Sequence, residues 1–324
     1  MTRGTIAATG PVDPVAIRLL EPFGDVVCAP ESTEESLLPI LQHAIGLIVR
    51  GDSRVGAQLM AAAPLLRVIG RTGAGYDSVD VEAATARGIP VLYTPGANAR
   101  AVAEAALALL LALAKKLAYW DGQLKSGNWR SRYGVRSADL EGAVLGIVGF
   151  GSTGRMLAEL ARPFRMTILA HDPYADPEAA ARLGVQLAGL DDLLARSDYV
   201  SLHVALTAET RGMINRTTVA RMKPGAILVN LARGGVIESL DVLHEALASG
   251  RLSGVGLDVF DPEPPDVRHP LFGLPQCLTS PHALAMTPGA MENIFRVLAE
   301  DMASFFRGER PRWVVNPGVL ERAP

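Results

Sequence analysis

A glycine-rich turn between a predicted strand and a predicted helix constrains the fold of this chain more than any other feature. The turn reads Gly149-Phe150-Gly151-Ser152-Thr153-Gly154. An apolar run over residues 144–148 precedes it and predicts a buried parallel strand, and residues 155–161 are typical of a helix. A second apolar run over 166–170 leads to Asp172, about 20 residues after the glycines. This order of strand, turn, helix, strand and acid predicts a dinucleotide-binding unit.

The residue types in the turn suit the phosphates of a dinucleotide. Gly149 permits the tight turn, Gly151 lets a pyrophosphate approach the backbone, and Gly154 lets the helix pack closely on the strand. Ser152 and Thr153 lie at the start of the following helix, whose free N–H groups and positive dipole end favour anions. We therefore predict that these five residues bind the phosphates.

Asp172 indicates which dinucleotide binds. Its carboxylate can accept hydrogen bonds from both hydroxyls of a ribose, and its charge would repel a 2′-phosphate. We therefore predict NAD, and not NADP, as the cofactor.

The remainder of the chain alternates strand patterns with helix patterns, which is typical of parallel sheets. With 324 residues, the chain has room for two domains. We predict an α/β fold with two doubly wound parallel-sheet domains. The predicted strands outside the glycine unit cover residues 4–9, 45–50, 67–71, 89–93, 199–204, 226–230, 254–259 and 277–279.

A long apolar helix is predicted from Ala101 to Leu117, with Asn98 as its N-cap. A helix that is apolar on nearly all sides must be buried all round. Burial inside one chain would satisfy this requirement. We favour burial at a subunit interface, because the helix joins the two predicted domains.

Composition and charge exclude several classes of partner. The net charge of −3 argues against nucleic acid and against an acidic membrane surface. The longest uncharged apolar run, 105–114, is too short to span a bilayer, and the N-terminus lacks the apolar segment of a signal peptide. Cys28 and Cys277 form no metal-ligand pattern and are expected to be reduced thiols. We therefore expect a cytoplasmic protein without a metal site.

Three residues with catalytic potential follow strands in the second half of the chain: Arg233, Glu263 and His282. Because the carboxyl ends of parallel strands meet at one edge of a sheet, we expect these side chains to converge near the nicotinamide. Arginine can hold a carboxylate through two parallel hydrogen bonds, and histidine can give or take a proton near neutral pH. A purely structural ion pair between Arg233 and Glu263 is the simpler alternative.

Several segments of the chain together match a known family pattern. They are RTGAGYD (71–77), TPGANARAVAE (94–104), GFGSTG (149–154), LHVALTAETRGMI (202–214), NLARGGVI (230–237), GLDVFDPEPP (256–265) and SPH (280–282). With these motifs the chain resembles the NAD-dependent D-2-hydroxyacid dehydrogenases, the family of phosphoglycerate dehydrogenase and glyoxylate/hydroxypyruvate reductase. The resemblance runs from Ile45 to Pro317.

The resemblance implies an oxidoreductase that transfers hydride between NADH and a 2-oxo acid or D-2-hydroxy acid. It implies that Arg233 binds the substrate carboxylate and carbonyl. It further implies that His282 is the acid/base and that Glu263 pairs with it.

The resemblance also implies contacts around this centre. On the cofactor side, Asp258 is expected at the nicotinamide amide, and we assign His203 and Ala232 to the same side; packing alone is the alternative for His203. On the substrate side, the backbone N–H groups of Gly73, Ala74 and Gly75 are expected to hold the carboxylate. Arg50 is either a substrate contact or a plain surface charge.

The family architecture implied is a Rossmann NAD-binding domain inserted into a flavodoxin-like substrate domain. The predicted substrate domain comprises residues 1–98 and 287–324, because the C-terminal helix of the family returns to the first domain. The predicted NAD-binding domain comprises residues 99–286. Since the family dimerises through the helix after Asn98, we expect a homodimer formed around Ala101 to Leu117.

Substrate choice is left open by the sequence. Leu284 stands where the family usually has a small residue and could narrow the pocket, which would suit glyoxylate or hydroxypyruvate, whereas phosphoglycerate would need basic residues such as Arg50. One alternative function is an NAD(H)-responsive binding protein without turnover, as in the corepressors of this family. Another is a dehydrogenase of formate or phosphite, but formate enzymes typically carry glutamine at the position of Glu263.

Overall fold

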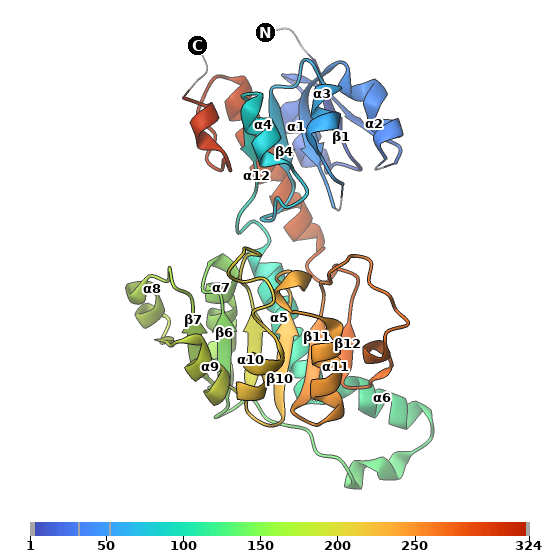
Figure 1. Ribbon diagram of the computed structural model, residues 1–324, viewed down its shortest axis with the longest axis vertical. Coiled ribbons are helices and arrows are strands. Elements are labelled where there is room, and N and C mark those ends of the chain that lie inside the picture. Colours follow the sequence, from blue (N-terminus) through green and yellow to red (C-terminus); the bar gives the residue numbers. More distant parts are fainter. Residues whose placement is uncertain (1–3, 32, 52, 322–324) are drawn as a thin grey trace. The chain divides into compact units, whose positions relative to one another are not determined.

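The computed structural model describes residues 4–31, 33–51 and 53–321, which divide into two compact units (Figure 1). The terminal unit combines Met1–Asn98 with Met286–Pro324, and the central unit is Ala99–Ala285. Each unit has one sheet whose strands are all parallel. The predicted fold class, two α/β domains with parallel sheets, is therefore confirmed.

The sheet of the terminal unit has the strand order β2-β1-β3-β4-β5, with helices on both faces. Leu47 and Ile69 point to one face, in a core shared with α2, α3 and α4, and Ile48 and Val68 point to the other, which is covered by α1 and α12. The elements are β1 (Gly4–Ala8), α1 (Pro14–Leu20), β2 (Gly24–Cys28), α2 (Glu34–Leu41), β3 (Ala44–Val49), α3 (Ala57–Ala61), β4 (Val68–Arg71), α4 (Val81–Ala86), β5 (Val91–Leu92), α12 (Pro288–Phe306) and the 3-10 turn η5 (Pro317–Val319).

The segment after α12 is fastened to the terminal unit by a buried carboxylate. Asp301 is only 1% exposed and accepts hydrogen bonds from Arg312 Nε and from the N–H of Trp313, both at 3.0 Å. Val315 then donates its N–H to the carbonyl of Val91 at 2.8 Å. Residues 312–315 are therefore held against α12 and against β5, the edge strand of this sheet.

The sheet of the central unit has the order β12-β11-β10-β9-β6-β7-β8. Its strand order reverses between β6 and β9, the point where open α/β sheets bind ligands beyond the carboxyl ends of their strands. The elements are α5 (Ala99–Ala114), α6 (Leu117–Lys125), η1 (Trp129–Tyr133), β6 (Val144–Val148), α7 (Ser152–Ala161), η2 (Arg162–Phe164), β7 (Thr167–His171), α8 (Pro177–Arg182), β8 (Gln186–Leu187), α9 (Leu190–Arg196), β9 (Tyr199–Leu202), α10 (Arg216–Arg221), β10 (Ala226–Asn230), η3 (Gly234–Val236), α11 (Leu240–Ala248), β11 (Leu252–Leu257), η4 (Pro270–Gly273) and β12 (Cys277–Thr279).

The long apolar helix begins and ends earlier in the chain than the sequence predicted, at residues 99–114 and not 101–117. It ends at Ala114, because Lys116 takes a left-handed conformation with φ of 52° before α6 begins. Nine of the 16 residues of α5 are buried against α7 and against the face of the sheet formed by β10 and β11. A Cβ on Gly256 of β11 would lie 3.2 Å from Leu109, so small residues in the strand admit the helix. The chain itself therefore buries most of a helix that we expected a subunit interface to cover.

None of the helices in the described ranges combines the length and apolar character that crossing a bilayer requires.

Candidate active site

The glycine turn connects β6 to α7 at the point where the strand order reverses. Gly149 has a φ of 96°, and a Cβ there would lie 2.6 Å from the carbonyl carbon of His203. A Cβ on Gly154 would lie 2.1 Å from the carbonyl oxygen of Gly149. Only glycine fits at either position, because the turn packs directly on its own backbone and on the loop after β9.

The same turn has the features that a pyrophosphate needs. A Cβ on Gly151 would meet no atom within 4 Å, so packing does not require this glycine. Gly151 is the N-cap of α7, and no side chain caps the first turn, where Ser152 and Thr153 lie. Uncapped N–H groups at the positive end of a helix, next to a glycine that packing does not require, fit a dinucleotide phosphate.

Asp172 follows β7, and two backbone donors hold its carboxylate. Oδ2 accepts a hydrogen bond from the N–H of Phe150 at 2.8 Å, and Oδ1 accepts one from the N–H of Tyr174 at 2.9 Å. The first bond ties the acid to the glycine turn. The residue predicted for the ribose is therefore fixed beside the residues predicted for the phosphates.

His203 follows β9 and lies against the glycine turn. Its N–H donates to the carbonyl of Val148 at 2.6 Å, and its Nε2 lies 2.8 Å from Ser201 Oγ. Burial lowers the pKa of His203 to about 4, so the ring is neutral near pH 7. A neutral ring is compatible with packing and with a cofactor contact, but it cannot act as an acid at neutral pH.

Asn230, the last residue of β10, shapes the loop that carries Arg233. Its fully buried side chain accepts a hydrogen bond from the N–H of Ala232 at 3.0 Å and donates one to the carbonyl of Arg233 at 2.9 Å. Arg233 Nη1 in turn donates to the carbonyl of Ala232 at 2.8 Å. Asn230 was not among the predicted site residues. Its place in NLARGGVI, a polar residue at the end of an apolar strand, nevertheless indicates a hydrogen-bonding role, because buried polar groups need partners.

Glu263 and His282 are in direct contact. His282 Nδ1 lies 3.1 Å from Glu263 Oε2, and Glu263 Oε1 accepts a hydrogen bond from the N–H of Phe260 at 3.0 Å. Burial raises the pKa of Glu263, but the hydrogen bonds from His282 and Phe260 and the charge of Arg233 outweigh it and leave this pKa below its ordinary value. The structure thus joins two of the three predicted catalytic residues, and the charge of the third acts on the pair.

Asp258 lies just after β11 and is 3% exposed. Its Oδ1 accepts three hydrogen bonds, from Ser280 Oγ at 2.6 Å, from the N–H of Ala283 at 2.9 Å and from the N–H of Leu284 at 3.3 Å. Its Oδ2 accepts none from the described residues. The carboxylate predicted to meet the nicotinamide amide therefore also binds the turn around His282. Ser280 was likewise not among the predicted site residues, although it belongs to the SPH segment.

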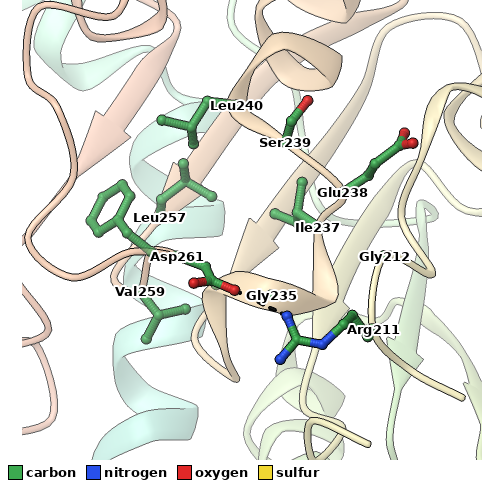
Figure 2. Close-up of a pocket in the computed structure, with 12 residues that line it drawn as sticks. Arg211, Gly212, Gly235, Ile237, Glu238, Ser239, Leu240, Leu257, Val259 and Asp261 are labelled. Carbon is green, nitrogen blue, oxygen red and sulfur yellow. Dashed lines mark hydrogen bonds and ion pairs between the residues drawn. The ribbon is translucent and has the colours of Figure 1, made fainter. Parts of the chain in front are cut away.

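A cavity of about 240 Å³ lies between the loops that follow β10 and β11 (Figure 2). Arg211 and Asp261 line it, with Arg211 Nη1 3.2 Å from Asp261 Oδ2. A Cβ on Gly234 would lie 1.9 Å from the carbonyl carbon of Phe260, so the two loops pack backbone to backbone. The lining, all from described residues, includes no residue of the glycine turn, so this cavity is not the predicted dinucleotide site.

In the terminal unit, Arg50 is held by contacts with residues of the same unit. Its guanidinium lies 5.2 Å from the ring centre of Phe295, and Nη1 donates to the carbonyl of Pro11. Its Nε is buried without a hydrogen-bond partner among the described residues, and burial lowers the pKa of this arginine. These contacts are compatible with a structural role, and a spare donor remains.

The predicted carboxylate-binding loop follows β4 in the same unit. Gly73 has a φ of 121°, and its N–H donates to Thr94 Oγ1 at 2.8 Å. The N–H groups of Ala74 and Gly75 donate to no acceptor among the described residues. Of the three predicted backbone donors, Gly73 thus already donates to Thr94, in the segment after β5.

Comparison with known proteins agrees with this arrangement. The chain matches the family described as D-isomer specific 2-hydroxyacid dehydrogenase, NAD binding domain, over residues 107–283. It is 39% identical over 313 residues to D-3-phosphoglycerate dehydrogenase of Methanocaldococcus jannaschii, covering 96% of this chain and 59% of that protein. It is also 39% identical over 303 residues to hydroxypyruvate reductase of Thermotoga maritima, covering 93% of this chain and 97% of that protein.

Among solved structures, a glyoxylate reductase from Paecilomyes thermophila has a TM-score of 0.87 and 30% identity, covering 97% of this chain and 99% of that one. The chain spans less than two thirds of the length of the phosphoglycerate dehydrogenase that it matches, but almost the whole length of the two reductases. The chain belongs to the D-isomer specific 2-hydroxyacid dehydrogenase family.

Proposed function

We propose that this protein is an NAD-dependent D-2-hydroxyacid dehydrogenase that interconverts a 2-oxo acid and the D-2-hydroxy acid. The observation that supports this proposal most directly is the contact between His282 Nδ1 and Glu263 Oε2 at 3.1 Å. Since a carboxylate holds one ring nitrogen, the other nitrogen, Nε2, is left to exchange a proton with the substrate oxygen.

The glycine turn and Asp172 would hold NAD, which would supply or accept the hydride when bound. Arg233 binds the substrate carboxylate and polarises the carbonyl, so that charge developing on its oxygen is stabilised. His282 gives the proton to that oxygen during reduction and takes it back during oxidation. Glu263 orients the imidazole and stabilises its protonated form.

For the substrate we propose a small 2-oxo acid of the glyoxylate or hydroxypyruvate type, with a phosphoglycerate-type substrate as the alternative. Two relatives named above are reductases of hydroxypyruvate and of glyoxylate, and this chain matches nearly their full length. Leu284, 37% exposed, is two residues from His282 and adds bulk next to the proposed acid/base. We keep the proposal that Ala74 and Gly75 donate to the substrate carboxylate, with Arg50 as a further contact.

The competing function is an NAD(H)-responsive binding protein without turnover. It predicts tight NADH binding and no oxidation of NADH by any 2-oxo acid. The aligned pair Glu263–His282 favours the enzyme, because a sensor does not need a histidine held for proton transfer.

The test is NADH and NADPH oxidation with glyoxylate, hydroxypyruvate, pyruvate, phenylpyruvate and phosphohydroxypyruvate. We expect turnover with NADH, and His282→Ala should lower kcat by about 100-fold or more while the Kd for NADH is unchanged. His43→Ala, an exposed histidine of the terminal unit, is the control and should leave kcat unchanged. An unchanged kcat in His282→Ala would refute the assignment of the acid/base.

We further propose a homodimer. Because α5 is largely covered by its own chain, the exposed apolar side chains that follow it are the better candidates for the contact: Leu117, Leu124, Trp129 and Tyr133. Light scattering checks this proposal: the wild type should be a dimer and Leu124→Glu a monomer.

We also propose a cytoplasmic location, which the two free thiols, Cys28 and Cys277, support.

A further inference from the structure

The turn that carries His282 adopts a conformation that must be held in place. His282 has a φ of 53°, in the left-handed region that few residues other than glycine adopt. A residue other than glycine held there is strained and persists only where surrounding contacts enforce it. The contact of the imidazole with Glu263 depends on this backbone geometry, since the turn sets the direction in which the side chain leaves the chain.

Asp258 supplies those contacts from both sides of the histidine. Its Oδ1 accepts from Ser280 Oγ, two residues before His282, and from the N–H groups of Ala283 and Leu284, the two residues after it. Two backbone bonds at 3.0 Å complete the turn, from the N–H of Ser280 to the carbonyl of Leu257 and from the N–H of His282 to the carbonyl of Ser280. One oxygen of the nearly buried Asp258 side chain thus binds residues on both sides of His282 and holds the turn together.

Ser280 is the side chain on which this arrangement can be tested. Its hydroxyl makes the shortest of the three bonds to Asp258, at 2.6 Å, as is typical of a donor bound to a charged acceptor. The other two donors are backbone N–H groups, which only proline would remove, and proline would also constrain the backbone of the turn. Asp258 itself is unsuitable, because the same carboxylate is proposed to meet the nicotinamide amide.

We propose that Ser280 is a positioning residue that holds His282 against Glu263 by anchoring the turn to Asp258 Oδ1, which leaves Oδ2 free to bind another donor. The inference rests on the proposed function, because the consequence for turnover follows only if His282 is the acid/base. Its structural part, the dependence of the His282–Glu263 contact on Ser280, is independent of the reaction.

The kinetic experiment compares Ser280→Ala and Ser280→Thr with the wild type. We expect S280A to lower kcat by about tenfold to a hundredfold, the range for losing a hydrogen bond to a charged group, with little change in KM or in the Kd for NADH. Ser280→Thr keeps the hydroxyl and should restore kcat to nearly the wild-type value. The matched control is Ser249→Ala, an exposed serine whose hydroxyl donates to the carbonyl of Glu245 at 2.8 Å, and it should leave all three constants unchanged.

The second readout needs no turnover. In protein with 15N-labelled histidine, Glu263→Gln should change the chemical shift of the imidazole Nδ1 of His282. The same substitution should change it by less than half as much in the S280A background, because the ring has already left Glu263. If S280A melts below the assay temperature, Ser280→Cys, which keeps the size and weakens the donor, replaces it in both measurements.

A wild-type kcat in S280A would overturn the proposal, and so would a response to Glu263→Gln that is the same in both backgrounds. A loss of kcat that Ser280→Thr does not restore would also overturn it, because the hydroxyl would not be the cause. If the wild-type protein turns over no 2-oxo acid but the chemical-shift response depends on Ser280, the proposed function fails and the positioning of His282 stands.

Discussion

The loops at the carboxyl ends of the two sheets are held by different sets of side chains, carboxylates and an amide in the central unit and hydroxyls and arginines in the terminal unit. In the central unit, Asp172, Asn230 and Asp258 stand at or just after the ends of β7, β10 and β11, and each accepts hydrogen bonds from N–H groups of the loops. In the terminal unit, the hydroxyl groups of Thr9 and Thr94 accept hydrogen bonds from loop N–H groups, and arginine side chains donate to loop carbonyl groups. Arg50 donates to Pro11, and Arg71 Nη2 donates to Gly51 at 2.9 Å.

The difference shows in which unit the hydrogen bonds among the described residues already hold the predicted site residues in place. The acceptors of the central unit have backbone donors and fix the positions of Arg233 and His282. In the terminal unit, Arg50 Nε and Ser53 Oγ are buried with no hydrogen-bond partner among the described residues. Both atoms could therefore bond to a ligand. We therefore expect substitutions in the central unit to change cofactor binding or turnover, and substitutions in the terminal unit to change the affinity for the anionic substrate.

The largest expected effect separates the two units by their response to acid. The folded-state pKa of His203, about 4, lies below the ordinary value of 6.5, so between these pH values the unfolded chain binds a proton that the folded chain does not. The stability contribution is complete above pH 6.5 and is lost as the pH falls towards 4, by about 1.4 kcal/mol per pH unit at most and roughly 3 kcal/mol in total. The terminal unit contains only one histidine, the exposed His43.

Hydrogen exchange of peptides from each unit at pH 7 and pH 5, corrected for intrinsic rates, measures this effect. Protection should fall in β9 and its neighbours, and His203→Gln should remove most of the pH dependence. An equal loss of protection in the terminal unit, or one that persists in His203→Gln, would contradict the assignment to this residue.

The next effect concerns Asp172 and the cofactor. Asp172→Ala removes two hydrogen bonds to backbone N–H groups and the proposed ribose acceptor, so the Kd for NADH should rise by about tenfold to a hundredfold. Selectivity for NADH over NADPH should fall, because the repelling charge is gone. Fluorescence titration measures both constants. Asp176→Asn, at the exposed N-cap of α8, is the control. A strong preference of the wild type for NADPH would refute our interpretation of Asp172.

A smaller effect decides between the two interpretations of Arg50. If Arg50 contacts the substrate, Arg50→Gln should raise KM for the 2-oxo acid by about tenfold and leave the Kd for NADH unchanged. If Arg50 only supports the fold through Phe295 and Pro11, the melting temperature should fall while KM is unchanged. Steady-state kinetics and a thermal melt on the same preparation distinguish the two outcomes. A lower melting temperature with an unchanged KM would mean that Arg50 of the terminal unit does not contribute to substrate affinity.

The smallest effect is expected at the cavity between the β10 and β11 loops. Both side chains of the ion pair between Arg211 and Asp261 are exposed to solvent, which weakens their attraction. Arg211→Ala should therefore lower the free energy of unfolding by less than about 1 kcal/mol. The kcat should change little, because the close packing of Gly234 on Phe260 holds the loops independently of the ion pair. Chemical denaturation and kcat measure both. A large loss of kcat would mean that the cavity wall, and not the backbone packing, positions Arg233.

Elements that are defined by local pattern could be predicted. The strand, turn and helix around Gly149 follow from residues adjacent in sequence, and the approach of His282 to Glu263 follows from the rule that parallel strands end at one edge. The edge strand β2 could not be predicted, because a half-exposed strand with Asp25 and Cys28 on its surface has no continuous apolar run. The break at Lys116 also had no signal, since both neighbouring segments favour helix.

Patterns along the chain were sufficient to predict the family, the parallel α/β architecture, and the residue types from which a dinucleotide site and an acid/base pair can be built. These depend on short motifs and on strand order, both of which are readable along the chain. Three features became visible only in the folded chain: α5 is buried by its own sheet, Asn230 shapes the Arg233 loop, and Ser280 and Asp258 hold the turn at His282. The reason is that a hydrogen bond or packing contact between distant segments depends on where both partners lie in space, and a pattern along one segment contains no information about the other.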